Sequence, residues 1–324
     1  MKARIVGTGT YVPSRVLTNA DLERMVATSD EWIRERTGIQ ERRIAGAGEA
    51  CSDLAVQAGK RALAAAGLKA TELDMILVAT CTGDYLLPAT ACLVQHQLGA
   101  TKAAACDLSA ACCGFIYALS VADAYVKTGM RHVLVIGSEV MSTITDWTDR
   151  NTCIIFGDGA GAVIISAYEG ERGILSTHLR SDGNLCELIA VPGGGSRTPA
   201  SEKVIAERMQ YIKMKGHETF KVAVRTLEEI ARETLEANHL RVEDLDLYVP
   251  HQANVRILKA VTERLGLPIE KVMLNLDRYG NTSAASIPIA LHEAVGAGRI
   301  RDGSLVMLGA FGAGLTWASA MIRW

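Results

Sequence analysis

The sequence lacks several features that would place it in other classes of protein. It has no run of about eighteen apolar residues without a charge, and its start, MKARIVGTGTYVP, has no long apolar stretch typical of a signal peptide. The formal net charge is only −2 over 324 residues, whereas nucleic acid or an anionic membrane would require a large basic excess. We therefore expect a soluble cytoplasmic protein with neither of these partners.

Spacings typical of metal sites and disulfide frameworks are also missing. Neither C-x-x-C nor H-E-x-x-H occurs, so a zinc site has little support. The eight cysteines follow no framework spacing, and we expect most of them to be small buried hydrophobic residues. What the sequence does contain is 49% hydrophobic and 22% charged residues, a composition typical of a globular protein large enough for two cores.

The chain carries an internal duplication. The segment GLKATELDMILV (67–78) resembles HLRVEDLDLYVP (239–250), and MRHVLVIG, ending at Gly137, resembles RIRDGSLVMLG, ending at Gly309. Both matches have the same offset, since 239 − 67 and 309 − 137 are each 172. Two matches in one register indicate a repeated structural unit.

The offset changes after the second match. FGDGAGAVII, from Phe156, resembles FGAGLTWASAMI, from Phe311, and 311 − 156 is 155. The first half therefore holds about 17 extra residues (172 − 155), near 139–155. An insertion of this kind is expected to be a loop with a functional role.

Strand-like and helix-like patterns alternate in each half. In the first half we expect the strands ARIVGTG, DMILVAT, KAAACDL and HVLVIGS. We also expect three helices, DLAVQAGKRALAAAG, PATACLVQHQLG and GFIYALSVADAYVKTG. Ser52 is expected to cap the first helix and Gly67 to end it, and Pro88 is expected to open the second. The second half repeats this order with FKVAVRTLEEIARETLEA, LDLYVP, VRILKAVTERLG, KVMLNL, SIPIALHEAVGAG and SLVMLGA. Such alternation favours mostly parallel sheets covered by helices, so we expect two similar α/β halves, 1–170 and 171–324.

The segment DLSAACCGFIYAL contains a candidate nucleophile. A strand ends near Leu108, small residues turn the chain, and a helix begins around Cys112. A thiol at such a position meets unpaired backbone N–H groups and the positive end of the helix dipole, which favours the thiolate. On this segment alone, Cys112 and Cys113 could equally be ordinary buried cysteines, and only one of the two can face a cleft.

Two further turns carry candidate side chains. His251 directly follows the strand LDLYVP, and open α/β sheets collect ligands at strand ends. Asn281 precedes a helix in RYGNTSAAS, and 281 − 172 is 109, so its turn is the counterpart of the Cys112 turn. A histidine is more often structural, and an asparagine here is more often a simple N-cap. A pseudo-twofold arrangement would nevertheless bring the Cys112 and Asn281 turns towards one central cleft.

Five motifs, SAACCGF, FGDGAGA, HQANVRI, GNTSAAS and GAFGAGLTW, together closely resemble the beta-ketoacyl-acyl carrier protein synthase III family over nearly the whole chain. The resemblance implies a thiolase-like fold, with two duplicated α/β halves in α-β-α-β-α layers. It also implies an acyltransferase that initiates fatty acid biosynthesis. Such an enzyme takes an acyl group from acyl-coenzyme A and condenses it with malonyl-acyl carrier protein, with loss of CO2, to give a 3-oxoacyl-acyl carrier protein. No permanently bound cofactor and no metal are implied.

The resemblance implies catalytic roles for three side chains. Cys112 matches the nucleophile that carries the acyl group, and Cys113 matches a small packing residue. His251 and Asn281 match the pair of donors that stabilise the enolate formed when malonyl thioester loses CO2. The oxyanion hole maps to the backbone N–H groups of Cys112 and Ala313. The family often has glycine at the second position, so Ala313 can serve only if its φ is not strongly strained.

The resemblance also implies a coenzyme A site, at Thr28, Trp32, Arg36, Arg150 and Asn254. Trp32 and Arg36, in DEWIRERTG, match residues that stack on and pair with the adenine and phosphate end, and Arg150 in the extra loop completes this clamp. Asn254 matches a residue that hydrogen-bonds the pantetheine arm. Without the resemblance, solvated surface arginines would be the default interpretation.

Two interaction surfaces follow from the same resemblance. Leu87 matches the position at which a partner subunit closes the acyl pocket, which implies a homodimer. It is smaller than the aromatic residue of many acetyl-preferring relatives, a hint of room for a longer or branched starter. Lys221, Arg256 and Lys259, with Arg264, resemble a basic patch that docks the acidic carrier protein, although a solvated helix face is the usual meaning of such a pattern.

Other functions fit less well. Thiolases, hydroxymethylglutaryl-coenzyme A synthases and chalcone-type synthases share the fold. A thiolase would need a second reactive cysteine in GAFGAGLTW, which has none. The segment TSDEWIRERTG and the docking arginine fit a carrier-protein enzyme better than a chalcone-type synthase. A starter-unit ketosynthase of a specialised-metabolite (polyketide-type) pathway stays open. A papain-like hydrolase would need C-G-S-C-W near its start. FGDGAGA does not give the G-x-G-x-x-G of a nucleotide site, and we expect its glycines to reflect tight packing of two sheets.

Overall fold

Two sheets organise the computed structural model, which describes residues 2–324. The five-stranded sheet has the order β1 (Lys2–Tyr11), β7 (Asp158–Tyr168), β6 (His132–Val140), β4 (Met75–Ala79), β5 (Ala104–Leu108). The four-stranded sheet has the order β8 (Gly173–Ser181), β13 (Thr316–Arg323), β12 (Leu305–Gly312), β11 (Leu247–Pro250). Each sheet has two antiparallel pairs followed by a parallel pair, and the larger sheet adds one more parallel pair, β4 with β5. The same arrangement therefore occurs twice, as the repeat predicts.

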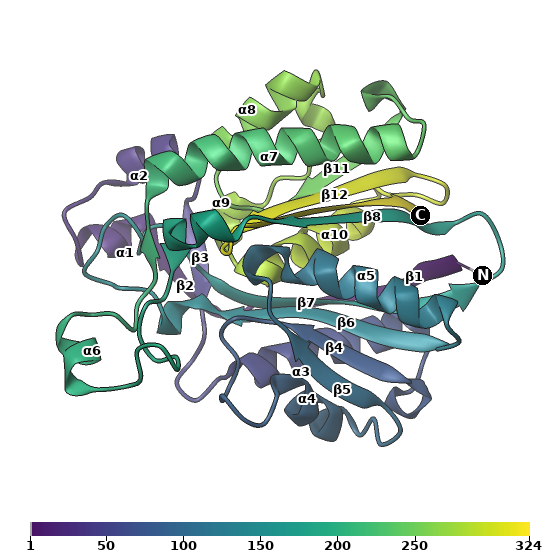
Figure 1. Cartoon of the computed structure of the whole chain (residues 1–324), viewed down its shortest axis with the longest axis horizontal. Coiled ribbons are helices and arrows are strands. Elements are labelled where there is room, and N and C mark those ends of the chain that lie inside the picture. Colours follow the sequence, from purple (N-terminus) through teal and green to yellow (C-terminus); the bar gives the residue numbers. More distant parts are fainter. Residues whose placement is uncertain (1) are drawn as a thin grey trace.

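Helices separate and cover the sheets (Figure 1). The first sheet is covered on its outside by α3 (Cys51–Ala66) and α4 (Thr90–Leu98), and the second by α7 (Gly216–Ala237) and α8 (Val255–Leu265). Between the sheets lie α5 (Gly114–Lys127) and α10 (Ser286–Gly296). The order of layers is thus α-β-α-β-α, the thiolase-like arrangement that the motifs imply. Within the described residues, every helix is too short or too polar to span a lipid bilayer.

The layers explain why β4 reads as a continuous apolar run. Met75, Leu77 and Ala79 belong to the core around α5 and α10, whereas Ile76 and Val78 belong to the core under α3 and α4. Successive side chains of a strand point to opposite faces. A strand with helices on both faces therefore needs apolar residues at every position.

The predicted strands and helices of the first half are present, with one wrong cap and one late start. The α3 helix begins at Cys51 with Ala50 as its N-cap, so Ser52 is not the cap. The Ser52 hydroxyl donates instead to Oδ2 of Asp84, in the loop after β4, at 2.7 Å. The helix ends at Gly67, which is left-handed with φ 67°, as predicted. The α4 helix begins at Thr90 rather than directly at Pro88.

The predicted strand KVMLNL is wrong. Only an isolated bridge joins Val272 to Tyr248 of β11, and a short helix, α9 (Leu276–Tyr279), follows. The Gln252 side chain explains the difference, because its amide donates to Met273 O at 3.0 Å and its oxygen accepts from Asn275 N at 3.0 Å. A side chain thus takes the hydrogen-bonding groups that a strand ladder would use.

The glycines of FGDGAGA permit close packing, but of a helix rather than of two sheets. A Cβ on Gly161 would lie 2.7 Å from backbone atoms of Pro288 and Ile289 in α10, and one on Gly159 would lie 3.0 Å from the Ile289 side chain. A Cβ on Gly157 would lie 2.3 Å from Tyr279 O. The central helix α10 can therefore approach β7 only because Gly159 and Gly161 lack side chains, and Gly157 allows the same close approach to α9.

The extra loop runs from 141 to 157 between β6 and β7, whereas the equivalent β12–β13 connection is only 313–315. Around it lie the small elements β2 (Arg15–Thr18), α1 (Asn19–Glu23), α2 (Asp30–Thr37), β3 (Glu41–Ile44), β9 (Ile189–Ala190), α6 (Glu202–Ala206) and β10 (Lys213–Met214). The fully buried Arg42 of β3 donates to Ile154 O at 2.8 Å. This bond ties the extra loop to the β2–β3 hairpin.

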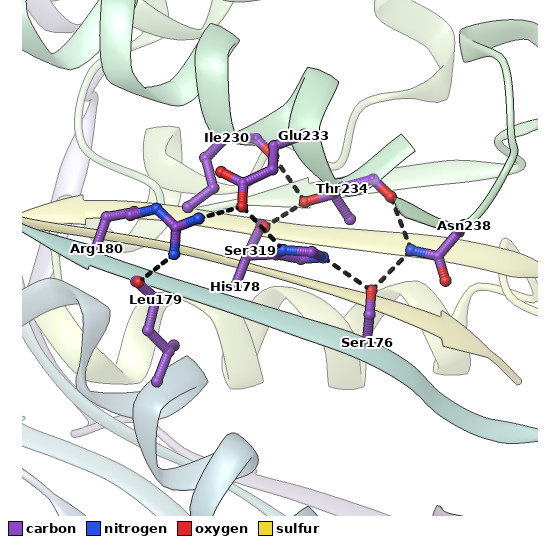
Figure 2. A network of polar contacts seen from close by, with 9 residues as sticks. All are labelled: Ser176, His178, Leu179, Arg180, Ile230, Glu233, Thr234, Asn238 and Ser319. Carbon is purple, nitrogen blue, oxygen red and sulfur yellow. Dashed lines mark hydrogen bonds and ion pairs between the residues drawn. The ribbon is translucent and has the colours of Figure 1, made fainter. Parts of the chain in front are cut away.

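A polar network fastens α7 to the edge strand β8 (Figure 2). Glu233 pairs with Arg180, and its Oε1 lies 3.3 Å from His178 Nδ1. On the other side of the ring, His178 Nε2 lies 3.1 Å from Ser176 Oγ, to which Asn238 Nδ2 donates at 2.7 Å. This network holds the C-terminal half of α7, so that its N-terminal residues can form one wall of the cavity described next.

Candidate active site

A cavity of about 740 Å³ is lined by residues of both halves. Its lining includes Cys112, His251 and Asn281, the three predicted catalytic residues. Trp32 and Arg36 of α2 and Asn254 at the start of α8 line it as well. The residues that the sequence places far apart are therefore brought to one space.

Cys112 lies in a short 3-10 turn, Ala111–Cys113, between β5 and α5. The two adjacent cysteines point to different environments. Cys112 lines the cavity, whereas Cys113 is fully buried, with its Sγ 3.3 Å from Thr316 O. The cleft-facing thiol is thus Cys112, and Cys113 packs in the core.

Burial raises the pKa of the Cys112 thiol to about 12. A side-chain contact with Ser283 and the backbone N–H of Cys112 itself lower this pKa, while the charge of Glu139 raises it. The sequence predicted the opposite net direction, from the dipole of a helix beginning at Cys112. The α5 helix begins only at Gly114, and desolvation outweighs the local donors, so the resting group is a thiol.

His251 directly follows β11, and its backbone N–H donates to Gly309 O at 2.7 Å. The residue is 3% exposed, and its ring Nδ1 is buried without a hydrogen-bond partner. Burial lowers the pKa of His251 to about 3, because no group around it compensates for the desolvation of an imidazolium. The ring is therefore neutral at physiological pH.

Asn281 is held by the extra loop. Its backbone N–H donates to Ile155 O at 2.9 Å, and its carbonyl accepts from Gly157 N at 3.1 Å. The side-chain Oδ1 accepts from Ser283 N at 2.8 Å. With Oδ1 engaged, the amide presents its Nδ2–H donors as the remaining polar group at the cavity.

Glu139 is a residue at this site to which the sequence assigned no role. It lies at the end of β6, is fully buried, and accepts from Ser283 Oγ at 3.0 Å and Cys81 N at 3.1 Å. Burial raises the pKa of this carboxyl. The only sequence signal was an acid at the end of an otherwise apolar strand, HVLVIGSEV.

The predicted coenzyme A residues cluster around Trp32. The guanidinium carbon of Arg36 lies 5.4 Å from the Trp32 ring centroid, and that of Arg150 lies 4.2 Å from it. Arg150 also donates to Ala27 O at 2.8 Å, which fixes the extra loop next to α2. The hydroxyl of Thr28 is buried without a partner. Trp32 and Arg36 therefore line the cavity, whereas Arg150 and Thr28 lie outside its lining, with Arg150 over the Trp32 ring.

Asn254 has a structural task in addition to its predicted one. Its Oδ1 caps α8 by accepting from Arg256 N at 2.8 Å, and its Nδ2 donates to Arg36 O at 2.9 Å. The side chain thus joins α8 to α2 across the mouth of the cavity. A ligand that bonds Nδ2 would replace the contact with Arg36.

Two of the three predicted docking residues, Lys221 and Arg256, line the cavity mouth, and the third, Lys259, lies one turn further along α8. Within the described residues, none of the three forms an ion pair. Arg264 differs, since it lies 3.3 Å from Glu228 and is neutralised. The unpaired cations therefore lie next to the cavity.

The remaining two predicted residues lie outside the cavity lining. Leu87 is 87% exposed, and its predicted role requires a second copy of the chain. Ala313 follows β12, and its φ is not in the left-handed region. Before it, a Cβ on Gly312 would lie 2.8 Å from Cys112 N, so the chain at 312–313 passes directly beside the nucleophile candidate.

A duplicated five-layer fold that brings a thiol, a neutral imidazole and an amide donor into one cavity defines a thiolase-fold condensing enzyme. Two family models match the chain: 3-Oxoacyl-[acyl-carrier-protein (ACP)] synthase III at residues 106–183, and the C-terminal region of the same synthase at 235–324. The chain is 54% identical over 323 residues to a beta-ketoacyl-[acyl-carrier-protein] synthase III from Caldanaerobacter subterraneus subsp. tengcongensis, covering 99% of this chain and 98% of that protein.

Solved structures agree with these matches. The 3-oxoacyl-[acyl-carrier-protein] synthase III of Aquifex aeolicus VF5 is 50% identical with a TM-score of 0.93, covering 99% of this chain and 100% of that one. A priming beta-ketosynthase from the R1128 polyketide pathway has a TM-score of 0.92 but only 36% identity, with 99% and 96% covered. The chain belongs to the beta-ketoacyl-[acyl-carrier-protein] synthase III family. It is a condensing acyltransferase of fatty acid synthesis, and the polyketide alternative is not favoured.

Proposed function

We propose that the enzyme transfers an acyl group from acyl-coenzyme A to Cys112 Sγ and condenses it with malonyl-acyl carrier protein to give a 3-oxoacyl-acyl carrier protein. The observation that carries this proposal is the shared cavity of Cys112, His251 and Asn281 in a member of this family. In the first step the Cys112–acyl bond forms as the bond to coenzyme A sulfur breaks. In the second, a carbon–carbon bond forms and Cys112 is released.

Two backbone donors support the acylation step. A tetrahedral intermediate on Cys112 needs N–H groups about 3 Å from its oxyanion. We assign these to Cys112 and Ala313, because the 312–313 segment passes beside Cys112 and Ala313 has an unstrained φ. Within the described residues, the Ala313 N–H makes no other hydrogen bond.

His251 and Asn281 are proposed to stabilise the enolate formed by decarboxylation. His251 Nδ1 has no acceptor nearby, so its neutral ring is best satisfied with the proton on Nε2. Asn281 Oδ1 is engaged, which leaves its Nδ2–H free. Two neutral N–H donors stabilise an anion that exists only after the carboxylate begins to leave, so they favour the transition state over the substrate. This step requires neither an external base nor a metal.

The substrates are proposed to bind at the cationic mouth of the cavity. Arg36 and Arg150 beside Trp32 suit the phosphates and adenine of coenzyme A, and the free hydroxyl of Thr28 offers a further hydrogen bond. The unpaired Lys221, Arg256 and Lys259 form one basic patch that suits an acidic carrier protein whose phosphopantetheine arm enters the same mouth.

We also propose that the enzyme is a cytoplasmic homodimer. Each subunit would have the halves 1–170 and 171–324. Tyr85, Leu86 and Leu87 are 65%, 93% and 87% exposed, an apolar surface that a monomer would leave in water. Three residues further on, Thr90 N donates to Asp107 of β5, the edge strand of the larger sheet. Pairing of this edge with a second copy would bury both features and bring Leu87 to the partner's cavity.

The decisive experiment is intact-mass spectrometry of the protein after incubation with acetyl-, propionyl-, isobutyryl- and octanoyl-coenzyme A. The wild-type enzyme is expected to gain the mass of one acyl group, and Cys112→Ser is expected to gain none. A Cys112→Ser protein that is acylated to the same extent would refute the assignment. The acyl-coenzyme A that labels most completely identifies the starter, which the size of Leu87 only hints at.

A further inference from the structure

The two proposed enolate donors, His251 and Asn281, come from separate connections that are 30 residues apart in sequence (281 − 251). Within the described residues, the buried Nδ1 of the His251 ring has no hydrogen-bond partner. The Asn281 side chain bonds only Ser283 N, in its own turn. Both donors must nevertheless lie about 3 Å from one developing oxyanion. Their spacing therefore depends on how the two backbone connections are joined to each other.

The buried side chain of Gln252 makes this join. It is 1% exposed and directly follows His251. Its Nε2 donates to Pro250 O at 2.8 Å and to Met273 O at 3.0 Å, and its Oε1 accepts from Asn275 N at 3.0 Å. Both amide protons have an acceptor and the oxygen has a donor, so the orientation of the amide is fixed. Three main-chain groups on the two connections thus meet at one side chain.

A carboxylate of the central layer continues the link towards Asn281. Asn275, the N-cap residue of α9, is 2% exposed, and its Nδ2 donates to Glu293 Oε2 at 2.9 Å. Glu293 also accepts from both terminal nitrogens of Arg278, at 3.0 and 2.9 Å, and from Tyr279 Oη at 2.6 Å. One carboxylate on α10 therefore holds the short helix α9 at both ends, two residues before Asn281.

We propose that Gln252 is a positioning residue for condensation, which sets the spacing between His251 and Asn281. This inference rests on the proposed role of these two side chains as enolate donors. Gln252 is absent from the cavity lining, so it acts through the two connections and not by contact with substrate. Acylation of Cys112 uses neither donor and should therefore be independent of Gln252.

The chemistry of the site requires an amide of this length. Glutamine presents two donors and one acceptor from a single planar group. Methionine has a similar length but offers none of these bonds, so Met273 O and Asn275 N would be left buried without the partners they have now. The segment that leads to Asn281 would then shift to find others, and a displacement of about 1 Å at a reacting group costs about 100-fold in rate.

The test compares the two steps of the reaction in Gln252→Met. Intact mass after incubation with acyl-coenzyme A measures acylation, and release of labelled CO2 from malonyl-acyl carrier protein measures condensation. We expect kcat for condensation to fall about 100-fold, with the KM for malonyl-acyl carrier protein and the rate of acylation within about threefold, because only transition-state contacts are lost. Gln252→Asn, a milder change whose amide is too short to reach both Met273 and Asn275, should give the same split with a fall of at least about tenfold.

Gln95→Met is the matched control. Gln95 is a half-buried residue of α4 whose Nε2 also donates to a main-chain carbonyl, Ala100 O, at 2.8 Å. It should leave both steps unchanged. An equal loss of acylation and condensation in the Gln252 variants would overturn the proposal, because it would indicate a general structural defect. Full condensation activity in both variants would overturn it as well.

A double-mutant cycle tests whether Gln252 acts through the donor pair. In the background of Asn281→Ala there is no spacing left to set, so adding Gln252→Met should lower condensation by no more than about threefold, far less than in the wild type. A further loss of about 100-fold in that background would place the effect of Gln252 elsewhere and overturn the proposal. Absence of acylation in the wild type, or full condensation activity in Asn281→Ala, would instead refute the proposed function on which this inference rests.

Discussion

Ala111 and Ser283 hold the same place in the two halves of the molecule and share an uncommon conformation. They are 172 positions apart (283 − 111), each opens a 3-10 turn, and their φ angles are 45° and 48°. Left-handed backbone is costly for a residue with a side chain, and it is retained where surrounding structure imposes it. The first turn presents Cys112 and the second begins two residues after Asn281, so the duplication has produced two copies of one strained turn with different chemistry.

The segment beside the first turn gives the first prediction, Gly312→Ala. A Cβ at this position would lie 2.8 Å from Cys112 N and 3.0 Å from its Cβ, so it would displace the nucleophile. We expect acylation, measured by intact mass, to fall at least about 100-fold, because a displacement of about 1 Å has that effect on a reacting group. Gly183→Ala is the control, since its Cβ would meet no atom within 4 Å. Normal acylation of Gly312→Ala would contradict the close approach.

The positions of Cys112, His251 and Asn281 could be predicted because each depends on local sequence. A strand end or a helix start places the backbone, and the repeat register relates Cys112 to Asn281. Glu139 could not be predicted in the same way. Its partners Thr80 and Ser283 are 59 and 144 residues away, and no local pattern states that they meet.

The pKa of Cys112 could not be predicted from the sequence either. The helix-start pattern correctly located Cys112 but gave the wrong direction for its pKa, since burial depends on every chain segment around the sulfur. The predicted strand KVMLNL failed for a related reason. Gln252 bonds Met273 O and Asn275 N, which are 21 and 23 residues away, and so replaces the strand ladder; no local sequence pattern indicates these bonds.

His251 should make the protein less stable in mild acid. The neutral ring is favoured in the folded state, with a pKa of about 3, whereas the unfolded chain binds a proton near the ordinary value of about 6.5. Below about pH 6.5 the unfolded state therefore binds more protons, and the free energy of unfolding falls by up to about 1.4 kcal/mol per pH unit from this group. Urea denaturation at pH 7.5 and 5.5 measures the change. His251→Gln should lose less stability over this range than the wild type; an equal loss would show that His251 does not titrate as described.

His251 and Asn281 are proposed to act in condensation but not in acylation, so variants at these two positions should affect the two steps differently. His251→Ala and Asn281→Ala each remove one donor to the enolate, so condensation with malonyl-acyl carrier protein should fall about 10²- to 10³-fold. Acylation of Cys112 from acyl-coenzyme A should remain within a few fold, because neither side chain serves that step. Intact mass reports acylation, and release of labelled CO2 reports condensation. Full condensation activity in either variant would refute the division of roles.

Arg208 is expected to anchor the segment between β9 and β10. Its guanidinium donates to both oxygens of Asp146 in the extra loop, at 2.8 and 2.6 Å, and this pair lowers the pKa of Asp146 well below its usual range. The contact is therefore present above the ordinary carboxyl pKa of about 4 and is lost only as pH falls below it. Arg208→Met should increase the rate of limited proteolysis within 190–212 at pH 7. Lys203→Met, at an exposed site on α6, is the control and should leave that rate unchanged.

Charge reversal at Lys259 separates the carrier protein from coenzyme A. Lys259 is exposed, has no acidic partner among the described residues and lies outside the cavity lining, so Lys259→Glu should leave the coenzyme A site intact. We expect the KM for malonyl-acyl carrier protein to rise about 5- to 10-fold, and less at high salt, because repulsion between exposed charges is screened beyond about 10 Å at 0.1 M salt. The KM for acyl-coenzyme A should stay within twofold. Lys60→Glu, on α3 in the opposite outer layer, controls for the change in net charge and should alter neither value. An equal rise in both KM values for Lys259→Glu would place the carrier protein elsewhere, and a rise for Lys60→Glu would assign the effect to overall charge rather than to docking on α8.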